Sequence, residues 1–156
     1  MFSGREFRSR SVKSPPTTPT ESISSEAADA RRALILVVER NPAVQKLERF
    51  LLEQAGFTVE FANDGEAALL RARELKPKIV VTEILVPRLD GLSLCRALKS
   101  DPETASIVVL IFSHLQAEER ALEAGADAFM VKPIDETNLI DTVAKLLKIR
   151  RKESGG

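Results

Sequence analysis

The sequence has no tryptophan or tyrosine, a single cysteine, and no net charge, because 23 basic residues balance 23 acidic ones. The lone Cys95 cannot close an intramolecular disulfide, and the charged start of the chain lacks the apolar core of a secretory signal, so we expect a cytoplasmic protein. The balanced charge excludes the strong positive field that nonspecific nucleic-acid binding uses. Nucleic acid is therefore not an expected partner.

Long apolar runs are also absent. No apolar run is longer than six residues, the length of the run from Ala33 to Val38, whereas a helix that crosses a bilayer needs about 20. No membrane partner is therefore expected, and a chain of 156 residues has the length of a single domain.

Composition divides the chain into three segments. Residues 1–32 are rich in serine, threonine and proline and contain few residues to bury, which predicts a disordered tail. Residues 33–150 are long enough to enclose one core between helices on both faces of a sheet. We expect residues 151–156 to form a flexible C-terminus.

Over 33–150, short apolar runs alternate with segments of helical period, which predicts an α/β fold with a five-stranded parallel sheet and helices on both faces. The expected strands are 34–38, 58–62, 79–82, 107–112 and 128–131. Helices are expected between the caps Asn41 and Gly56, from the cap Asn63 or Asp64 to a point before Pro77, at 92–99, after Ser113 as far as Ala124, and from the cap Asp135 onward. Their predicted buried faces include Val44, Leu47, Leu51 and Leu52 in the first helix and Ala67, Ala68, Leu70 and Leu75 in the second.

Polar residues follow the predicted strands where an open α/β sheet binds its ligands. They are Glu39, Arg40, Glu83, Ser113, His114 and Lys132. Two carboxylates, a hydroxyl and an ammonium at one edge could hold a divalent cation and a phosphate. His114 has no histidine or cysteine partner at metal-ligand spacing and is interpreted as a surface residue. The turn after the first strand contains no glycine and so lacks a phosphate-binding loop.

Four motifs occur in a characteristic order: LVVERNP at 36–42, VTEILVP at 81–87 followed by Asp90-Gly91, GAD at 125–127 and VKP at 131–133. Together they resemble the receiver domains of bacterial two-component response regulators, the CheY-like family, over 33–150. The resemblance implies the flavodoxin-like strand order 2-1-3-4-5. It also implies that an aspartate after the third strand takes a phosphoryl group from a histidine kinase, with magnesium held by two acidic residues after the first strand.

Two positions depart from the family pattern. Glu83 stands in place of the acceptor aspartate, and Arg40 stands in place of the second acidic residue, although Glu39 keeps a carboxylate at the first. Ser113 and Lys132 match the usual phosphate-contacting hydroxyl and amine. Replacing a carboxylate with a guanidinium removes a Mg²⁺ ligand and adds a positive charge. We expect no cofactor and weak or absent Mg²⁺ binding; any metal would use Glu39, Glu83 and Leu85.

Three interpretations of the pocket follow. In the first, Glu83 mimics a phosphoryl group and pairs with Lys132, Ser113 and Arg40. In the second, Glu83, Lys132 and Arg40 form a vestigial salt-bridge cluster. In the third, Glu83 itself accepts phosphate, although its extra methylene shifts the carboxylate from the attacking position.

The output side of the predicted domain also differs from the family. Phe129 occupies the aromatic switch position but lacks a phenolic hydroxyl, and it could equally be a plain core residue. The segment from Ser113 to Gly125 is about one helical turn shorter than usual. This shortening either alters the surface through which family members bind their partners or has no effect on binding.

The leading hypothesis is a stand-alone pseudo-receiver that is not an enzyme, has no catalytic residue and acts through protein–protein interaction. Its expected partners are signalling proteins such as a histidine kinase or a downstream target, and a homodimer is a further option. The alternatives are a conventional Mg²⁺-dependent phosphoacceptor that uses Glu83, and a small flavodoxin-like enzyme or nucleotide binder.

Overall fold

The computed structural model describes residues 33–133 and 136–155. The tail predicted at 1–32 and the predicted helix cap Asp135 lie outside these residues. The described chain contains a five-stranded parallel sheet of order β2-β1-β3-β4-β5, which confirms the expected flavodoxin-like order. The strands are β1 (Leu34–Val38), β2 (Thr58–Ala62), β3 (Ile79–Thr82), β4 (Val108–Ser113) and β5 (Ala128–Val131). Only β4 departs from the prediction, by one residue at each end.

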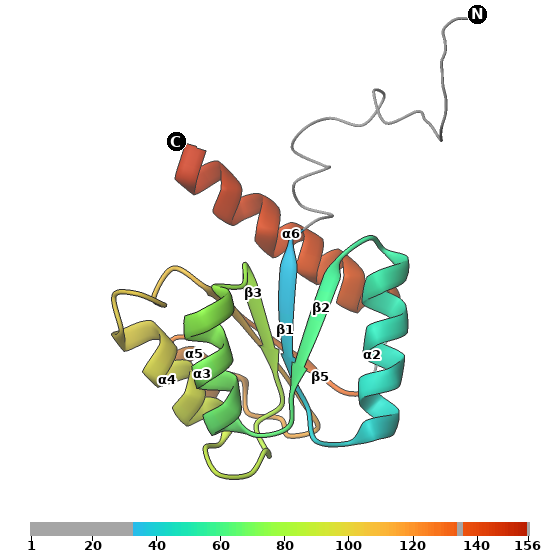
Figure 1. Cartoon of the computed structure of the whole chain (residues 1–156), viewed down its shortest axis with the longest axis horizontal. Coiled ribbons are helices and arrows are strands. Elements are labelled where there is room, and N and C mark those ends of the chain that lie inside the picture. Colours follow the sequence, from blue (N-terminus) through green and yellow to red (C-terminus); the bar gives the residue numbers. More distant parts are fainter. Residues whose placement is uncertain (1–32, 134–135, 156) are drawn as a thin grey trace, which may run out of the picture.

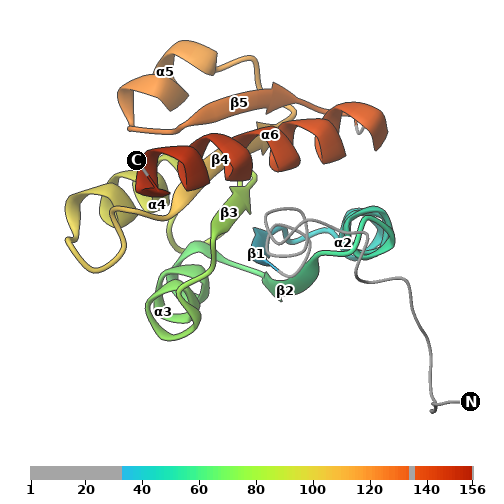
Figure 2. The same cartoon turned by 90° about the horizontal axis from the view of Figure 1, so that it is seen from above.

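Helices cover both faces of the sheet (Figures 1 and 2). They are α2 (Pro42–Gln54), α3 (Gly65–Leu75), α4 (Gly91–Ser100), α5 (Glu118–Glu123) and α6 (Glu136–Gly155). One buried cluster lies between the sheet and α3, α4 and α5, and contains Cys95. The second lies between the sheet and the helices α2 and α6. The last helix reaches Gly155, past the predicted domain boundary at 150.

Local sequence explains where the helices begin. The Asn41 side chain caps α2 by accepting hydrogen bonds from the Ala43 amide at 2.9 Å and the Val44 amide at 3.4 Å, and Pro42 occupies the first turn, where its missing N–H is not needed. Asp64 caps α3 and Asp90 caps α4 in the same way. These caps place the first turn of each helix beside the carboxyl end of the preceding strand.

The predicted buried faces of two helices need correction. Leu47 in α2 is 44% exposed and Leu70 in α3 is 62% exposed, and Leu75 is exposed as well. In α2 the buried position beside Leu47 is Glu48, one residue and about 100° farther around the helix. In α3 the buried positions are filled by the small residues Gly65, Ala68 and Ala72, because α3 packs closely against α4 and the β3–α4 loop and leaves no room for leucine.

Gly65 shows how close that approach is. A Cβ atom added at this position would lie 1.7 Å from the carbonyl oxygen of Leu89, and the Gly65 amide donates to the Pro87 carbonyl at 3.1 Å. The loop that follows β3 is therefore packed directly on the start of α3. The loop can hold this position only because residue 65 has no side chain.

None of the helices in the described part of the chain is both long enough and apolar enough to cross a bilayer.

Candidate functional site

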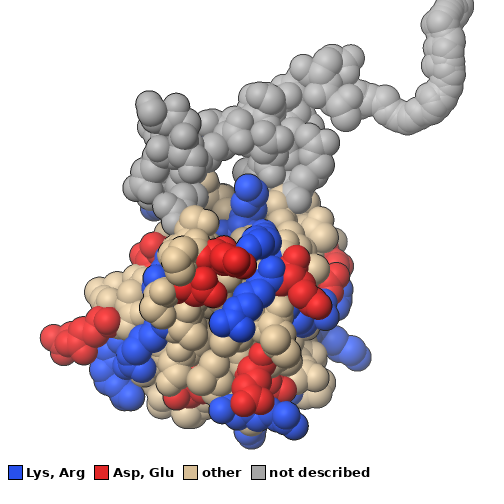
Figure 3. Space-filling view, turned by 60° about the vertical axis from the view of Figure 1, so that its left-hand side comes forward, with Lys and Arg blue, Asp and Glu red and all other residues tan. Residues whose placement is uncertain are grey.

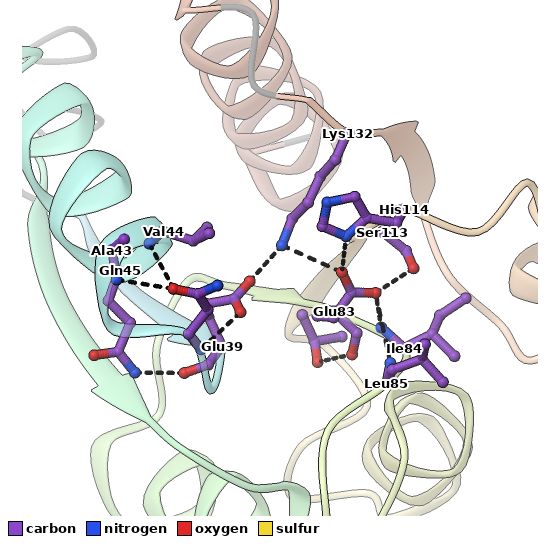
Figure 4. A network of polar contacts seen from close by, with 12 residues as sticks. Glu39, Ala43, Val44, Gln45, Glu83, Ile84, Leu85, Ser113, His114 and Lys132 are labelled. Atoms are coloured by element: carbon purple, nitrogen blue, oxygen red, sulfur yellow. Dashed lines mark hydrogen bonds and ion pairs between the residues drawn. The ribbon is translucent and has the colours of Figure 1, made fainter.

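Four polar side chains meet at the carboxyl edge of the sheet (Figure 4). Glu39 follows β1, Glu83 follows β3, Ser113 ends β4 and Lys132 follows β5, and all four are buried. They meet because the strands are parallel and in register, for example Val38 with Thr82 and Ser113 with Val131, so that the strand ends align. The structure thus brings together four of the residues that sequence analysis singled out.

Lys132 is the centre of this network. Its ammonium donates a hydrogen bond to Glu39 Oε1 and lies 3.2 Å from Glu83 Oε2, and it is 5.4 Å from the centre of the Phe112 ring. Burial by itself lowers the pKa of Lys132, but the hydrogen bond to Glu39 and the charges of Glu39 and Glu83 outweigh it and raise the pKa. The ammonium therefore stays charged in the interior.

Glu83 is held through both carboxylate oxygens. Its Oε1 accepts hydrogen bonds from the Ser113 hydroxyl and from the Ile84 amide at 2.7 Å, while its Oε2 faces Lys132. Burial raises the pKa of Glu83, yet the Ser113 hydrogen bond, the Lys132 charge and the Ile84 amide together lower it below the ordinary value. Glu83 is therefore an ionised carboxylate at neutral pH.

Glu39 connects the pocket to the start of α2. Its Oε2 accepts from the Asn41 amide at 3.0 Å, and its carbonyl accepts from the Gln45 side-chain amide. Gln45 also donates to Asn63 Oδ1 at 2.7 Å, on the loop after β2. The first carboxylate is thereby oriented by backbone and by α2 as well as by Lys132.

Arg40 lies outside the network. Its side chain is exposed to solvent, and within the described residues it forms no ion pair. This differs from both interpretations that placed its guanidinium against Glu83. An exposed guanidinium keeps its hydration and avoids burial beside Lys132, so the positive charge within the pocket comes from Lys132.

The family resemblance implies a magnesium site, but these residues do not fit one. The carboxylates of Glu39 and Glu83 are both bound to Lys132, whose charge would oppose a cation. Arg40 supplies no carboxylate, and across the described ranges no three histidine, cysteine or acidic side chains are grouped to hold a metal. Mg²⁺ needs several oxygen ligands in near-octahedral geometry, and this pocket does not offer them.

Two residues beside the pocket were not assigned to it from the sequence. His114, interpreted as a surface residue, is 69% exposed, and its Nδ1 lies 3.4 Å from Glu83 Oε2 at the mouth of the site. Glu48 of α2 is only 2% exposed, and burial raises its pKa to about 8 while the charge of Lys132 opposes the rise. The sequence held two signals for these residues. His114 is adjacent to Ser113, and Glu48 precedes the buried Leu51 and Leu52 by three and four residues.

Phe129 lies half-buried on β5 and packs against the buried cluster on the side of α3, α4 and α5. It lines a cleft of about 520 Å³ whose other walls come from α5 and the segments beside it; the lining residues are Gln116, Glu118, Glu119, Leu122 and Val131. The helix α5 has only six residues, in keeping with the short segment between Ser113 and Gly125.

Charges of both signs are interspersed over the face shown in Figure 3. Ion pairs among the described residues include Arg73 with Asp101 and Lys99 with Asp127. No continuous basic patch of the kind that follows a phosphate backbone is seen among the described residues on this face.

Most of the chain is similar to known proteins. A family model described as the response regulator receiver domain matches residues 35–144. Among curated proteins, the gliding motility regulatory protein of Myxococcus xanthus is 40% identical over 111 residues, which are 69% of this chain and 14% of that protein. The response regulator MprA of Mycobacterium ulcerans is 38% identical over 115 residues, 73% of this chain and 50% of that protein. The chain thus spans half or less of these two relatives.

Solved structures show the same architecture. The signal receiver domain of a signal transduction histidine kinase from Syntrophus aciditrophicus superposes with a TM-score of 0.69 and 32% identity, covering 74% of this chain and 89% of that chain. The chemotaxis response regulator CheY4 of Vibrio cholerae superposes with a TM-score of 0.70 at 21% identity, covering 74% of this chain and 98% of that chain, and supports the fold alone.

Proposed function

Because the chain belongs to the response regulator receiver domain family, we propose that it is a pseudo-receiver, which signals by contact with other proteins and does not use phosphorylation as its switch. Receiver domains are signalling modules that interact with histidine kinases and downstream effectors, and family membership favours this class over a flavodoxin-like enzyme or a nucleotide binder. The departures at Glu83 and Arg40 support the finer proposal.

One observation carries it: Ser113 and Lys132, the two groups expected to contact a phosphoryl group, are already bound to Glu83. Ser113 donates to Glu83 Oε1, and the Lys132 ammonium lies 3.2 Å from Oε2. A carboxylate offers one negative charge and two oxygens where a phosphoryl group offers nearly two charges and three oxygens. Glu83 is therefore a partial mimic of a phosphoryl group, built into the chain.

The same contacts work against phosphoryl transfer. A nucleophile needs a free oxygen aligned with the phosphorus atom, but each Glu83 oxygen is already in contact with a hydrogen-bond donor or a cation. The missing carboxylate at Arg40 removes a ligand for the Mg²⁺ that would neutralise the incoming phosphate. We therefore assign no catalytic residue to this pocket.

We include stand-alone action in this proposal. The two relatives described above carry their similar region within longer polypeptides, whereas a stand-alone receiver domain would need a separate partner protein to supply the output. An immunoblot of the source cells would test this, because a stand-alone protein migrates near 17.2 kDa and a longer polypeptide does not.

Phosphorylation can be tested directly. The chain is incubated with acetyl phosphate and Mg²⁺ and its intact mass is measured, with a conventional receiver domain as the positive control. We expect the control to gain one phosphoryl group and this chain to keep its mass. A phosphoryl group mapped to Glu83 would instead establish the Mg²⁺-dependent phosphoacceptor alternative.

A further inference from the structure

The cleft beside α5 and β5 presents apolar side chains to solvent. It lies at the edge of the sheet, where β5 is the last strand and α5 lies beside it (Figure 2). Its apolar wall consists of the half-buried Phe129 together with Leu122 and Val131, which are 51% and 43% exposed. Exposed apolar side chains that gather on one surface mark a binding site more often than scattered ones do.

The rim of this cleft carries negative charge. Glu118 and Glu119 line it together with Gln116, and no basic side chain is among the lining residues. Both carboxylates are exposed, and within the described residues neither forms an ion pair. A ligand that is complementary to this surface therefore combines aromatic or apolar groups with positive charge.

The same chain contains a segment of that composition. Residues 2–13 carry four basic side chains and one acidic side chain, namely Arg5, Arg8, Arg10 and Lys13 against Glu6. They also contain Phe2 and Phe7, two of the seven phenylalanines of the chain. By contrast, residues 14–30 contain neither a basic nor an aromatic residue. Residues 2–13 thus match the cleft both in charge and in apolar character.

We propose that residues 2–13 bind in the cleft beside α5 and β5 of the same molecule. A phenylalanine of the segment packs against Phe129 and Leu122, and its arginines pair with the carboxylates on the rim. A partner protein that uses this cleft has to displace the segment first. This inference goes beyond the proposed function, because it concerns what covers the surface beside α5 and holds whether or not Glu83 accepts phosphate.

The length of the connection permits this contact. Residues 14–32 span up to about 60 Å when extended. Three strand spacings, about 14 Å, separate β1 from β5, and β5 is about 13 Å long, so the connection reaches the cleft even around the outside of the sheet. Because the segment is tethered, its effective concentration at the cleft is on the order of millimolar. The modest affinity of exposed ion pairs and one aromatic contact is then sufficient.

Paramagnetic relaxation in the full chain tests the proposal. A nitroxide is attached to the ¹⁵N-labelled Ser9→Cys variant; Cys95 does not compete, because it is 0% exposed and burial raises its pKa to about 11. We expect the amide signals of Leu122 and Phe129 to lose at least about half of their intensity relative to the reduced label. The signal of Lys46, on α2, should keep its intensity. No loss at the cleft, or an equal loss at Lys46, would overturn the proposal.

Two variants separate the two kinds of contact. Glu119→Lys reverses one charge on the rim, and Phe7→Ser removes one aromatic ring without changing the charge of the segment. Each should restore the intensities of Leu122 and Phe129. Glu123→Lys is the matched control, because Glu123 is an exposed acid of the same helix that does not line the cleft; the loss of intensity should persist in this variant. An unchanged loss in Glu119→Lys or in Phe7→Ser would contradict the proposed contacts.

A mixing experiment identifies the source of the segment. Equal amounts of ¹⁵N-labelled chain without nitroxide and unlabelled chain with nitroxide on Ser9→Cys are combined. We expect no loss of intensity at Leu122 or Phe129, because the segment binds within its own molecule. A loss as large as that within one chain would show that a second copy supplies it, and would overturn the proposal. Failure of the proposed function has a separate readout, a gain of phosphate in the intact mass.

Discussion

The Lys132 ammonium lies 3.2 Å from Glu83 Oε2 and also donates a hydrogen bond to Glu39, so one buried cation joins the carboxyl ends of β1 and β3 to the segment after β5. Neither carboxylate has another basic side chain within ion-pair distance in the described residues, apart from His114 beside Glu83. The state of the pocket therefore depends on this one lysine.

Replacing Lys132 with methionine should lower the free energy of unfolding by about 3–5 kcal/mol, because it leaves two buried carboxylates without their cation. Urea unfolding at pH 7 measures the change. Lys76→Met is the control, since Lys76 is largely exposed and lies 3.5 Å from Glu103; its effect should stay below about 1 kcal/mol. Similar losses in the two variants would show that the buried pairs contribute no more than surface ones.

Ser113→Ala removes the hydroxyl that donates to Glu83 Oε1. We expect a loss of about 1–3 kcal/mol in the free energy of unfolding and a rise in the pKa of Glu83, because this hydrogen bond is the strongest influence holding that pKa down. Carboxyl ¹³C shifts across a pH titration report the pKa. The control is Ser100→Ala, whose hydroxyl lies exposed on α4 and donates to the Arg96 carbonyl. An unchanged Glu83 titration would contradict the contact.

Glu48 should give the fold an unusual pH dependence. Its pKa is raised to about 8 in the folded state from an ordinary 4.5, so the folded chain holds a proton that the unfolded chain releases, and stability falls as pH rises from about 4.5 to about 8. At pH 7 this costs roughly 3 kcal/mol. Urea unfolding of the parent and Glu48→Gln at pH 5, 6, 7 and 8 should show the variant gaining relative stability toward pH 8. Parallel curves would mean that Glu48 titrates normally.

Restoring two aspartates should restore cation binding. In the Arg40→Asp, Glu83→Asp double variant, a second carboxylate returns after β1 and the shorter side chain at position 83 leaves Lys132 less tightly paired. We expect 10 mM Mg²⁺ to leave the parent melting midpoint unchanged and to raise that of the variant by about 3 °C. Arg40→Gln is the control, because it removes the charge without adding a carboxylate. No response in the double variant would show that other features of the pocket exclude the metal.

Gly65→Ala should displace the loop after β3. The added Cβ would lie 1.7 Å from the Leu89 carbonyl oxygen, and this backbone atom cannot yield without moving the loop that contains Glu83 and Asp90. We expect a loss of at least about 2 kcal/mol in unfolding free energy, measured by urea titration. Glu66→Ala, at the exposed next position, should cost far less. Unchanged stability in Gly65→Ala would mean that the loop is not packed on α3.

Sequence pattern identified the regular structure well where local chemistry controls it. Asn41 and Pro42 mark the start of α2 because they satisfy or remove N–H groups that a helix cannot pair, and the apolar runs mark strands covered on both faces. The pattern was wrong for Leu47 and Leu70. It assigns every hydrophobic residue on one side of an amphipathic helix to the core, but the sequence does not show how wide the contact between helix and sheet is.

The sequence by itself determined the alternation of strands and helices, the caps, and the set of polar residues that follow each strand, since all of these depend on neighbours along the chain. Only the tertiary structure decided that Lys132 is shared by Glu39 and Glu83, that Arg40 is exposed to solvent, and that Glu48 is buried near them. These outcomes depend on distances and desolvation between residues far apart in sequence, and no local pattern encodes which carboxylate an ammonium will reach once water is excluded.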